Sequence, residues 1–185
     1  KGIGALYVRR QRPRVQLAPQ LRGGGQEQGL RSGTLYPPQI VGFAKAVELG
    51  LASMVTVAET QRRLRDRLWQ GLQGLPEIYL NGHPEQRLPG NLNVSIGGVD
   101  GSALVLGVQP VVAVSSGSAC SSAGTKPSHV LTALGRSPAL ARASLRFGLG
   151  RATTAAQIEQ ALHAVVTTVQ SLRQAASGPN CDKIA

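Results

Sequence analysis

Cys120 stands in the segment of this chain that is most suited to reactive chemistry. From Ser115 to Gly124 its neighbours are only serine, alanine and glycine, so no bulky or charged side chain holds the thiol in place. A structural cysteine usually occupies an apolar environment and behaves as a small hydrophobe, whereas an accessible thiolate is a nucleophile. From these residues alone two interpretations stay open: a reactive cysteine on a solvated loop, or a small-residue turn that contains a cysteine.

A second unusual segment is the glycine-rich stretch from Arg22 to Thr34, which ends in the residues Arg31-Ser-Gly-Thr34. Such a stretch needs special backbone angles or a close backbone approach, because glycine reaches conformations that other residues avoid. Pro37 and Pro38 follow it, and proline suits the first position of a helix. We therefore expect this loop to lead directly into a helix.

The chain is basic, with a formal net charge of +11 from 20 Lys and Arg against 9 Asp and Glu. Its densest cluster comprises Arg62, Arg63, Arg65 and Arg67, on a predicted helix without interleaved aromatic residues. Nucleic-acid grooves usually combine basic and aromatic side chains. We therefore interpret the cluster as a solvated helix face and expect no nucleic-acid partner, while an acidic protein partner stays open.

The composition favours a globular α/β protein in a reducing compartment. Hydrophobic residues make up 42% of the 185 residues and aromatic residues only 3%, so the core must depend on Leu, Val, Ile and Ala. No apolar run is expected to approach the ~18 residues of a membrane span, and no signal peptide opens the chain. Because Cys120 and Cys181 form no disulfide framework, we expect a cytoplasmic protein.

The hydrophobic periodicity predicts helices alternating with short strands. Residues 3–9 are predicted to form a strand; because the chain opens on it without an initiator methionine, we expect an N-terminally incomplete chain. Two helices should follow between Pro38 and Gly74, with Gly50 as a kink or an end between them. Further strands are expected at 78–80, 91–96, 111–114 and 144–149, and further helices at 101–107, at 127–134 and after a capping box formed by Thr154 and Gln157. The apolar stripe of this last helix is predicted to comprise Ile158, Leu162, Val166, Val169 and Leu172.

Four motifs, in this order, resemble those of the cysteine desulfurases of the class V aminotransferase family. They are Lys1–Val8, Arg31–Thr34 after a Gly-Gly-Gly-Gln-Glu run, Ser115–Ser122, and Ser144–Arg151. The resemblance extends to about residue 173. It implies the C-terminal part of a pyridoxal phosphate (PLP)-dependent transferase of fold type I, the aspartate aminotransferase-like fold. Residues 1–45 would end the large domain, 46–176 would form the small α/β domain, and 177–185 would be a flexible tail.

The resemblance also implies roles for three residues. Cys120 matches the nucleophile that takes sulfur from L-cysteine as a persulfide and releases alanine. Thr34 matches the threonine that reaches the phosphate of PLP in the other subunit of a homodimer. Arg146 matches the arginine that pairs with the carboxylate of the substrate. The plainer alternatives are a tight turn for the segment around Thr34 and a surface ion pair for Arg146.

The lysine that forms the Schiff base with PLP in this family has no counterpart here. It follows a histidine upstream of the segment that begins at Lys1, and Lys45, Lys126 and Lys183 lack that context. His83, His129 and His163 show no metal-ligand spacing and are interpreted as structural or solvated; no metal is expected. Cys181 is interpreted as incidental.

The implied partners are L-cysteine, a second copy of the chain, and a sulfur-acceptor or scaffold protein for iron–sulfur cluster assembly or tRNA thiolation. Two alternatives remain at this stage. The chain could be a truncated, non-catalytic paralogue that binds a complete desulfurase or its acceptors. It could also belong to a selenocysteine lyase, which uses similar machinery on another substrate.

Overall fold

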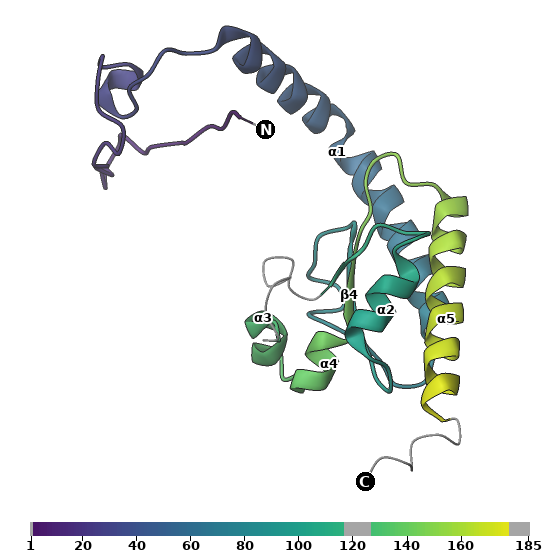
Figure 1. The fold of residues 1–185 in the computed structure, drawn as a ribbon. Helices are drawn as coiled ribbons and strands as arrows, with labels where there is room; N and C mark the ends of the chain where they lie inside the picture. Colours follow the sequence, from purple (N-terminus) through teal and green to yellow (C-terminus); the bar gives the residue numbers. More distant parts are fainter. Residues whose placement is uncertain (1, 117–126, 178–185) are drawn as a thin grey trace. The chain divides into compact units, whose positions relative to one another are not determined.

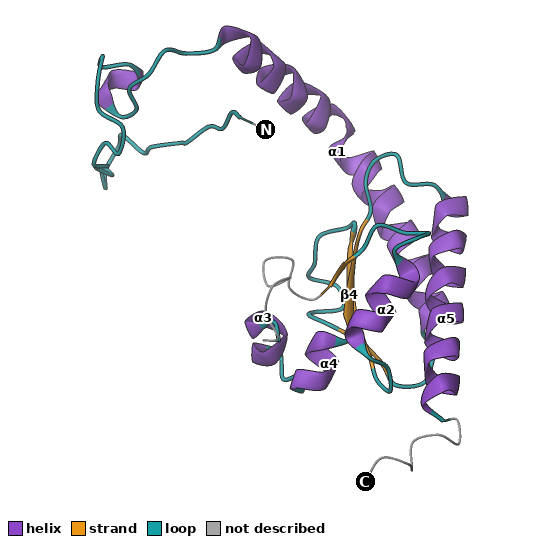
Figure 2. Cartoon of the chain, in the orientation of Figure 1, coloured by secondary structure: helices purple, strands orange, loops and turns teal. Residues whose placement is uncertain are grey.

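The computed structural model describes residues 2–116 and 127–177, which form two compact units: residues 1–54 and residues 55–185. The first unit consists of extended chain, a short 3-10 helix and the start of a long helix. The second unit contains a four-stranded antiparallel sheet with its helices (Figures 1 and 2). The predicted domain boundaries after residues 45 and 176 stay predictions.

The helices and strands follow one another along the chain as follows. They are η1 (Glu27–Gly29), α1 (Pro37–Leu72), β1 (Ile78–Leu80), β2 (Asn91–Ile96), α2 (Gly101–Val108), β3 (Ser115–Ser116), α3 (His129–Ala133), α4 (Pro138–Arg142), β4 (Ser144–Gly148) and α5 (Ala155–Ala176). The strands lie in the order β1-β2-β4-β3, and each neighbouring pair is antiparallel. The α/β class expected from the sequence is confirmed.

One face of the sheet is apolar and carries the core of the second unit. Successive side chains of a strand point to opposite faces, so Leu92, Val94 and Ile96 of β2 lie on one face, and all three are buried. Directly paired residues share a face, which places Leu145 and Phe147 of β4 beside them. Helical residues complete this core; the buried ones are Leu64, Leu68, Leu72, Leu104, Val108, Ile158, Val165 and Val169. Burying these side chains is the main stabilising contribution, at about 1.5–3 kcal/mol for each.

The opposite face of the sheet is polar. Register pairs place Ser95 of β2 against Tyr79 of β1 and Ser144 of β4, and Asn93 of β2 against Arg146 of β4. α4 covers part of this face, where the carbonyl of Leu140 accepts a hydrogen bond from the buried Ser144 hydroxyl. A sheet with one apolar and one polar face is typical of antiparallel structure.

Side-chain caps begin the helices of the second unit. Asp100 accepts a hydrogen bond from Ala103 N at 2.8 Å at the start of α2. Thr154 and Gln157 form the capping box predicted for α5, with distances of 2.9 and 3.3 Å. Each cap satisfies backbone donors that a helix leaves unpaired at its first turn. The predicted start of α5 is therefore confirmed.

Two predicted strands are wrong. Residues 3–9 form no strand, and Leu6 and Tyr7 are 77% and 88% exposed, because no described segment pairs with them and a single strand is not stable by itself. Residues 111–114 form a turn and a coil, and the strand begins only at Ser115, where pairing with β4 starts.

Two helix predictions also need correction. α1 is one continuous helix through Gly50, since a single glycine costs only about 1 kcal/mol relative to alanine in a helix interior. In α5 the buried face contains Ala161, Ala164 and Val165, whereas the predicted Leu162 and Val166 are half-buried. Small alanines let the helix approach its neighbours closely.

α1 is long and apolar enough to cross a membrane by length and composition alone, and none of its apolar window is buried in the structure. The expectation that no apolar run approaches the required length was therefore wrong. Lys45 and Glu48 are charged residues within this run, and they form an ion pair with 2.9 Å between Nζ and Oε1. The other residues of the run are largely apolar. One such helix is a weak indication of a membrane span, because core helices of soluble proteins pass the same test.

Candidate functional site

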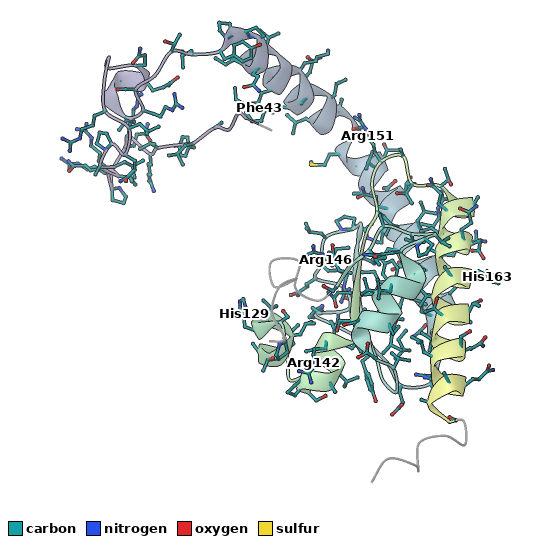
Figure 3. The ribbon with its side chains drawn as sticks, in the orientation of Figure 1. Phe43, His129, Arg142, Arg146, Arg151 and His163 are labelled. Carbon is teal, nitrogen blue, oxygen red and sulfur yellow. The ribbon has the colours of Figure 1, made fainter. Side chains whose placement is uncertain are left out.

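Arg146 projects from the polar face of the sheet beside the strand that leads to Cys120 (Figure 3). It alternates with the buried Leu145 and Phe147, which fix β4 against the core and leave Arg146 exposed. Its Nη2 donates a hydrogen bond to Oγ of Ser115 at 3.3 Å, and Ser115 is also its register partner on β3. The guanidinium thus lies beside Ser115, the first residue of β3, and Ser115 precedes Cys120 by five residues in the sequence.

A buried hydrogen-bond network supports the strands beside Arg146. Asn81 Nδ2 donates to Asn93 Oδ1 at 2.7 Å and to Ser95 Oγ at 2.8 Å. Ser144 Oγ donates to the Leu140 carbonyl, and it lies 2.8 Å from Ser95 Oγ. Because Ser144 donates its hydroxyl proton to the Leu140 carbonyl, the Ser95 hydroxyl must donate to Ser144 Oγ. Asn93 therefore has its side chain held on the same face as Arg146.

Arg136 joins this network to the segment between α3 and α4. Its Nε donates to Asn81 Oδ1 and its Nη2 to the Leu80 carbonyl, both at 2.7 Å. The guanidinium also lies 5.2 Å from the centre of the Tyr79 ring, a cation–π distance. Every polar atom of the Asn81 amide is thereby satisfied, and a fully satisfied buried network makes a site rigid.

Thr34 follows a loop that is closed by its own side chains. Ser32 is buried, and its hydroxyl accepts a hydrogen bond from Gly25 N at 3.3 Å. Gln26 Oε1 accepts one from Gly33 N at 3.1 Å. These two bonds join the arms of the glycine-rich stretch and leave Thr34 exposed at its end. The turn expected from the glycines is present, with its threonine available to a ligand.

The three predicted site residues belong to different parts of the chain. Thr34 belongs to the first unit and Arg146 to the second, and Cys120 lies outside the described residues, as do Lys126, Cys181 and Lys183. The roles assigned to Cys120, Thr34 and Arg146 therefore stay predictions.

The arginine cluster on α1 is not one solvated face, as the sequence had suggested. Arg62 and Arg63 are exposed, and Arg67 forms an exposed ion pair with Glu159 at 2.6 Å. Arg65 is instead buried, because it lies between Leu64 and Leu68 on the inward side. Its Nε and Nη2 donate to Asp66 Oδ1 at 2.9 and 2.7 Å.

Arg87 shares the charge of Asp66 with Arg65. Burial lowers the pKa of Arg87, the positive charge of Arg65 lowers it further, and Asp66 opposes both. Its guanidinium donates to the carbonyls of Asn81 and His83 at 2.8 and 2.7 Å. These bonds close the loop between β1 and β2, so Arg87 has a structural role.

The histidines contribute no metal site in the part of the chain that the structure describes, where no group of three His, Cys, Asp or Glu side chains could hold an ion. His83 Nδ1 accepts hydrogen bonds from the backbone N–H groups of Glu85 and Gln86 at 3.1 and 2.9 Å. His129 and His163 lie on α3 and α5 (Figure 3).

The family model for class-V aminotransferases matches residues 1–161. This chain belongs to the class-V aminotransferase family. Cysteine desulfurase IscS of Methylococcus capsulatus is 51% identical to this class-V chain over 174 residues, which are 94% of the chain and 43% of that protein. Cysteine desulfurase IscS of Acinetobacter baumannii strain AYE is also 51% identical, over 94% of the chain and 42% of its own length.

Solved structures agree with this class-V assignment. A NifS-like protein from Rickettsia africae superposes with a TM-score of 0.74 at 27% identity, over 84% of this chain and 41% of that one. DndA from Streptomyces lividans gives a TM-score of 0.59 at 34% identity, over 73% and 37% of the two chains. The class-V chain therefore spans less than half the length of the relatives it matches.

Sequence reasoning missed the residues that support Arg146. Ser115 was noted only as part of the cysteine segment, and its pairing with Arg146 joins residues 31 positions apart. Asn81 directly follows the predicted strand 78–80 and Arg136 follows a glycine, and single polar residues at such positions are common on surfaces, so neither gave a signal.

Proposed function

We propose that this chain provides the small-domain half of the active site of a PLP-dependent cysteine desulfurase. The observation that carries the proposal is the placement of Arg146: a guanidinium on the polar face of the sheet, hydrogen-bonded to the strand that leads to Cys120. The 51% identity to proteins named cysteine desulfurase supports the same conclusion.

Arg146 would bind the carboxylate of L-cysteine. A guanidinium donates two parallel hydrogen bonds to a planar carboxylate, which a lysine cannot do. Among the described residues Arg146 has no acidic partner, and its Nη2 donates to the neutral Ser115 hydroxyl. Within the described residues Arg146 takes part in no ion pair of the kind considered from the sequence, which supports the proposal that its positive charge binds an anion.

Cys120 would accept the sulfur atom. Its thiolate attacks the sulfur of the substrate, so that a sulfur–sulfur bond forms while the bond between the substrate's Cβ and its sulfur breaks. The electron pair of the broken bond stays on carbon, which takes up a proton and leaves as alanine. The enzyme keeps the sulfur as a cysteine persulfide, and an acceptor thiol can remove it.

The residues present fit part of a PLP site. Thr34 is exposed at the end of a closed glycine-rich loop, where its hydroxyl can donate to a phosphate oxygen of a neighbouring subunit's cofactor. PLP, when bound, supplies the electron sink that weakens bonds at the substrate's α and β carbons. The chain's own contribution is to bind the phosphate with Thr34, orient the substrate with Arg146 and take the sulfur on Cys120.

We further propose a cytoplasmic homodimer that passes sulfur to an acceptor or scaffold protein, in iron–sulfur cluster assembly or tRNA thiolation. The position of Thr34 supports the dimer, because the first unit offers its hydroxyl on an exposed loop. The small-residue segment around Cys120 supports transfer to a second protein, since such a segment suits a thiol that must reach two sites.

The proposal is tested in a chimera in which this chain replaces the matched 174 residues of the Methylococcus capsulatus relative. With PLP and a thiol reductant, the chimera should form alanine and sulfide from L-cysteine in equal amounts. Cys120→Ser should abolish sulfide transfer to the reductant, and Arg146→Gln should raise the KM for L-cysteine. A folded, PLP-loaded chimera that forms no alanine would contradict the proposal, and faster turnover of selenocysteine would favour a selenocysteine lyase instead.

A further inference from the structure

The guanidinium of Arg31 is packed against the backbone next to Thr34. A Cβ atom placed on Gly33 would lie 2.6 Å from Nη1 of Arg31, which is shorter than any contact between such atoms. Gly33 also has a φ of +130°, a value that disfavours residues with a side chain. Glycine at position 33 therefore leaves the space that the Arg31 guanidinium fills.

The backbone that carries Arg31 and Thr34 is held in place from several directions. Ser32, between them, is buried; its N–H donates to the Leu21 carbonyl at 3.1 Å and its hydroxyl binds Gly25 N. The Gly33 N–H is bound by Gln26. The loop is thus preorganised, and preorganisation lowers the entropy that a ligand must overcome on binding.

The loop also contains strained backbone. Glu27 and Gln28 both have positive φ values, 52° and 58°, a backbone conformation that residues other than glycine rarely adopt. Such strain persists only where surrounding contacts over-determine the backbone, and it concentrates at ligand sites. This is the second observation, besides the placement of Arg31, that separates the loop from an ordinary turn.

Arg31 carries a charge that nothing in the described structure neutralises. It is exposed, and among residues 2–116 and 127–177 no carboxylate forms an ion pair with it. An exposed hydroxyl lies three positions along the chain at Thr34. A guanidinium and a hydroxyl carried by one short loop can form a donor set for a doubly charged phosphate, to which a guanidinium donates charge-assisted hydrogen bonds.

We propose that Arg31 is a second phosphate-binding residue, which contacts the same cofactor phosphate as Thr34. This inference rests on the proposed function, because the phosphate is that of PLP. Arg31 supplies the positive charge, Thr34 supplies a neutral donor, and Gly33 keeps the guanidinium close to the backbone between them. The four residues Arg31-Ser-Gly-Thr34 then act together: Arg31 and Thr34 bind the phosphate, and Ser32 and Gly33 hold the backbone between them.

The test compares PLP with pyridoxal, which has the same ring and aldehyde but no phosphate. Both are titrated into the cofactor-free chimera, and binding is followed by the absorbance of the internal adduct. Arg31→Gln should weaken PLP binding about tenfold, the effect of losing one charge-assisted hydrogen bond at a partly exposed site, and should leave pyridoxal binding unchanged. Arg31→Lys should retain part of the preference for PLP over pyridoxal, because lysine keeps the positive charge but lacks the planar guanidinium.

Arg14→Gln is the matched control, because Arg14 is an exposed arginine of the same unit and its loss changes the net charge equally. It should bind both ligands as the unsubstituted chimera does. Equal PLP affinity in Arg31→Gln and in the unsubstituted protein would overturn the inference about Arg31 and leave the proposed function intact. Equal weakening of PLP and pyridoxal would also overturn it, by assigning Arg31 a structural role. A folded chimera that binds no PLP at all would contradict the proposed function together with this inference.

Discussion

Arg146 of β4 and Ser115 of β3 are register partners, and the arginine donates a hydrogen bond to the serine hydroxyl at 3.3 Å. The pair joins the proposed carboxylate-binding group to the strand that precedes Cys120. Cross-strand partners are the units that fix side-chain positions in a sheet. The proposed substrate-binding group and the start of the cysteine segment thus lie on neighbouring strands of one sheet.

Removal of the Ser115 hydroxyl should make the position of the Arg146 guanidinium less fixed without unfolding the sheet. In the chimera, Ser115→Ala is expected to raise the KM for L-cysteine about two- to fivefold, since one neutral hydrogen bond contributes about 0.5–1.5 kcal/mol, while kcat changes less. Steady-state kinetics of alanine formation measures both. Ser102→Ala, at an exposed serine of α2, is the control and should change neither value. An unchanged KM in Ser115→Ala would show that Arg146 does not depend on this bond.

Substitution of Asn81 should lower the free energy of unfolding more than substitution of most other polar residues of the second unit. Asn81→Ala leaves Arg136, Asn93 and Ser95 without a shared partner in a buried region. Each orphaned buried group costs about 1–3 kcal/mol, so we expect a loss of about 2–4 kcal/mol in the free energy of unfolding. Urea unfolding of the chain measures it, and Gln160→Ala on the exposed side of α5 should change it by less than about 0.5 kcal/mol. Equal values for both variants would contradict the role of the network.

Asp66 should stabilise two arginines at once. Asp66→Asn removes the anion beside the buried Arg65 and the partly buried Arg87, and we expect a loss of about 1–3 kcal/mol, because a charge deprived of its partner in a buried place is costly. Glu159→Gln breaks only the exposed pair with Arg67 and should cost less than about 1 kcal/mol. The two losses are compared by urea unfolding; a larger loss for Glu159→Gln would reverse this assignment.

Gly107 marks a close approach of α2 to α5. A Cβ at this position would lie 2.5 Å from Cγ2 of Thr168, so Gly107→Ala should destabilise the chain by about 1–3 kcal/mol through overpacking. Combining it with Thr168→Ser, which removes the clashing methyl group, should recover much of that loss. Gly148→Ala is the control, because no atom lies within 4 Å of its Cβ position. Additive losses in the double variant, measured by thermal unfolding, would show that the two sites are not in contact.

Local patterns were sufficient to predict most elements of the second unit. β1 and β2 have the predicted limits, since apolar and polar residues alternate there and turn residues bound them. The start of α5 followed from its capping box. These features depend on residues that are neighbours in the sequence.

The remaining features depend on distant contacts. β3 was predicted too early because only the pairing of Ser115 and Ser116 with β4 decides where it lies. The sequence predicts a solvated Arg65, but its burial depends on Asp66 and on the packing around Leu64. The Asn81 network joins β1, β2 and the segment before α4, and no periodicity indicates it. For the site, the sequence identified Arg146 and Thr34 as candidates but not the side chains that hold them.

The most direct test of the account is to find where the sulfur goes. The PLP-loaded chimera is mixed with L-cysteine without reductant, its thiols are blocked, and mass spectrometry of its peptides locates any added sulfur. We expect one extra sulfur atom on Cys120, in an amount that matches the alanine released in the first turnover, and none in Cys120→Ser. Added sulfur on Cys181 or on no cysteine of this chain, with alanine formation intact, would contradict it.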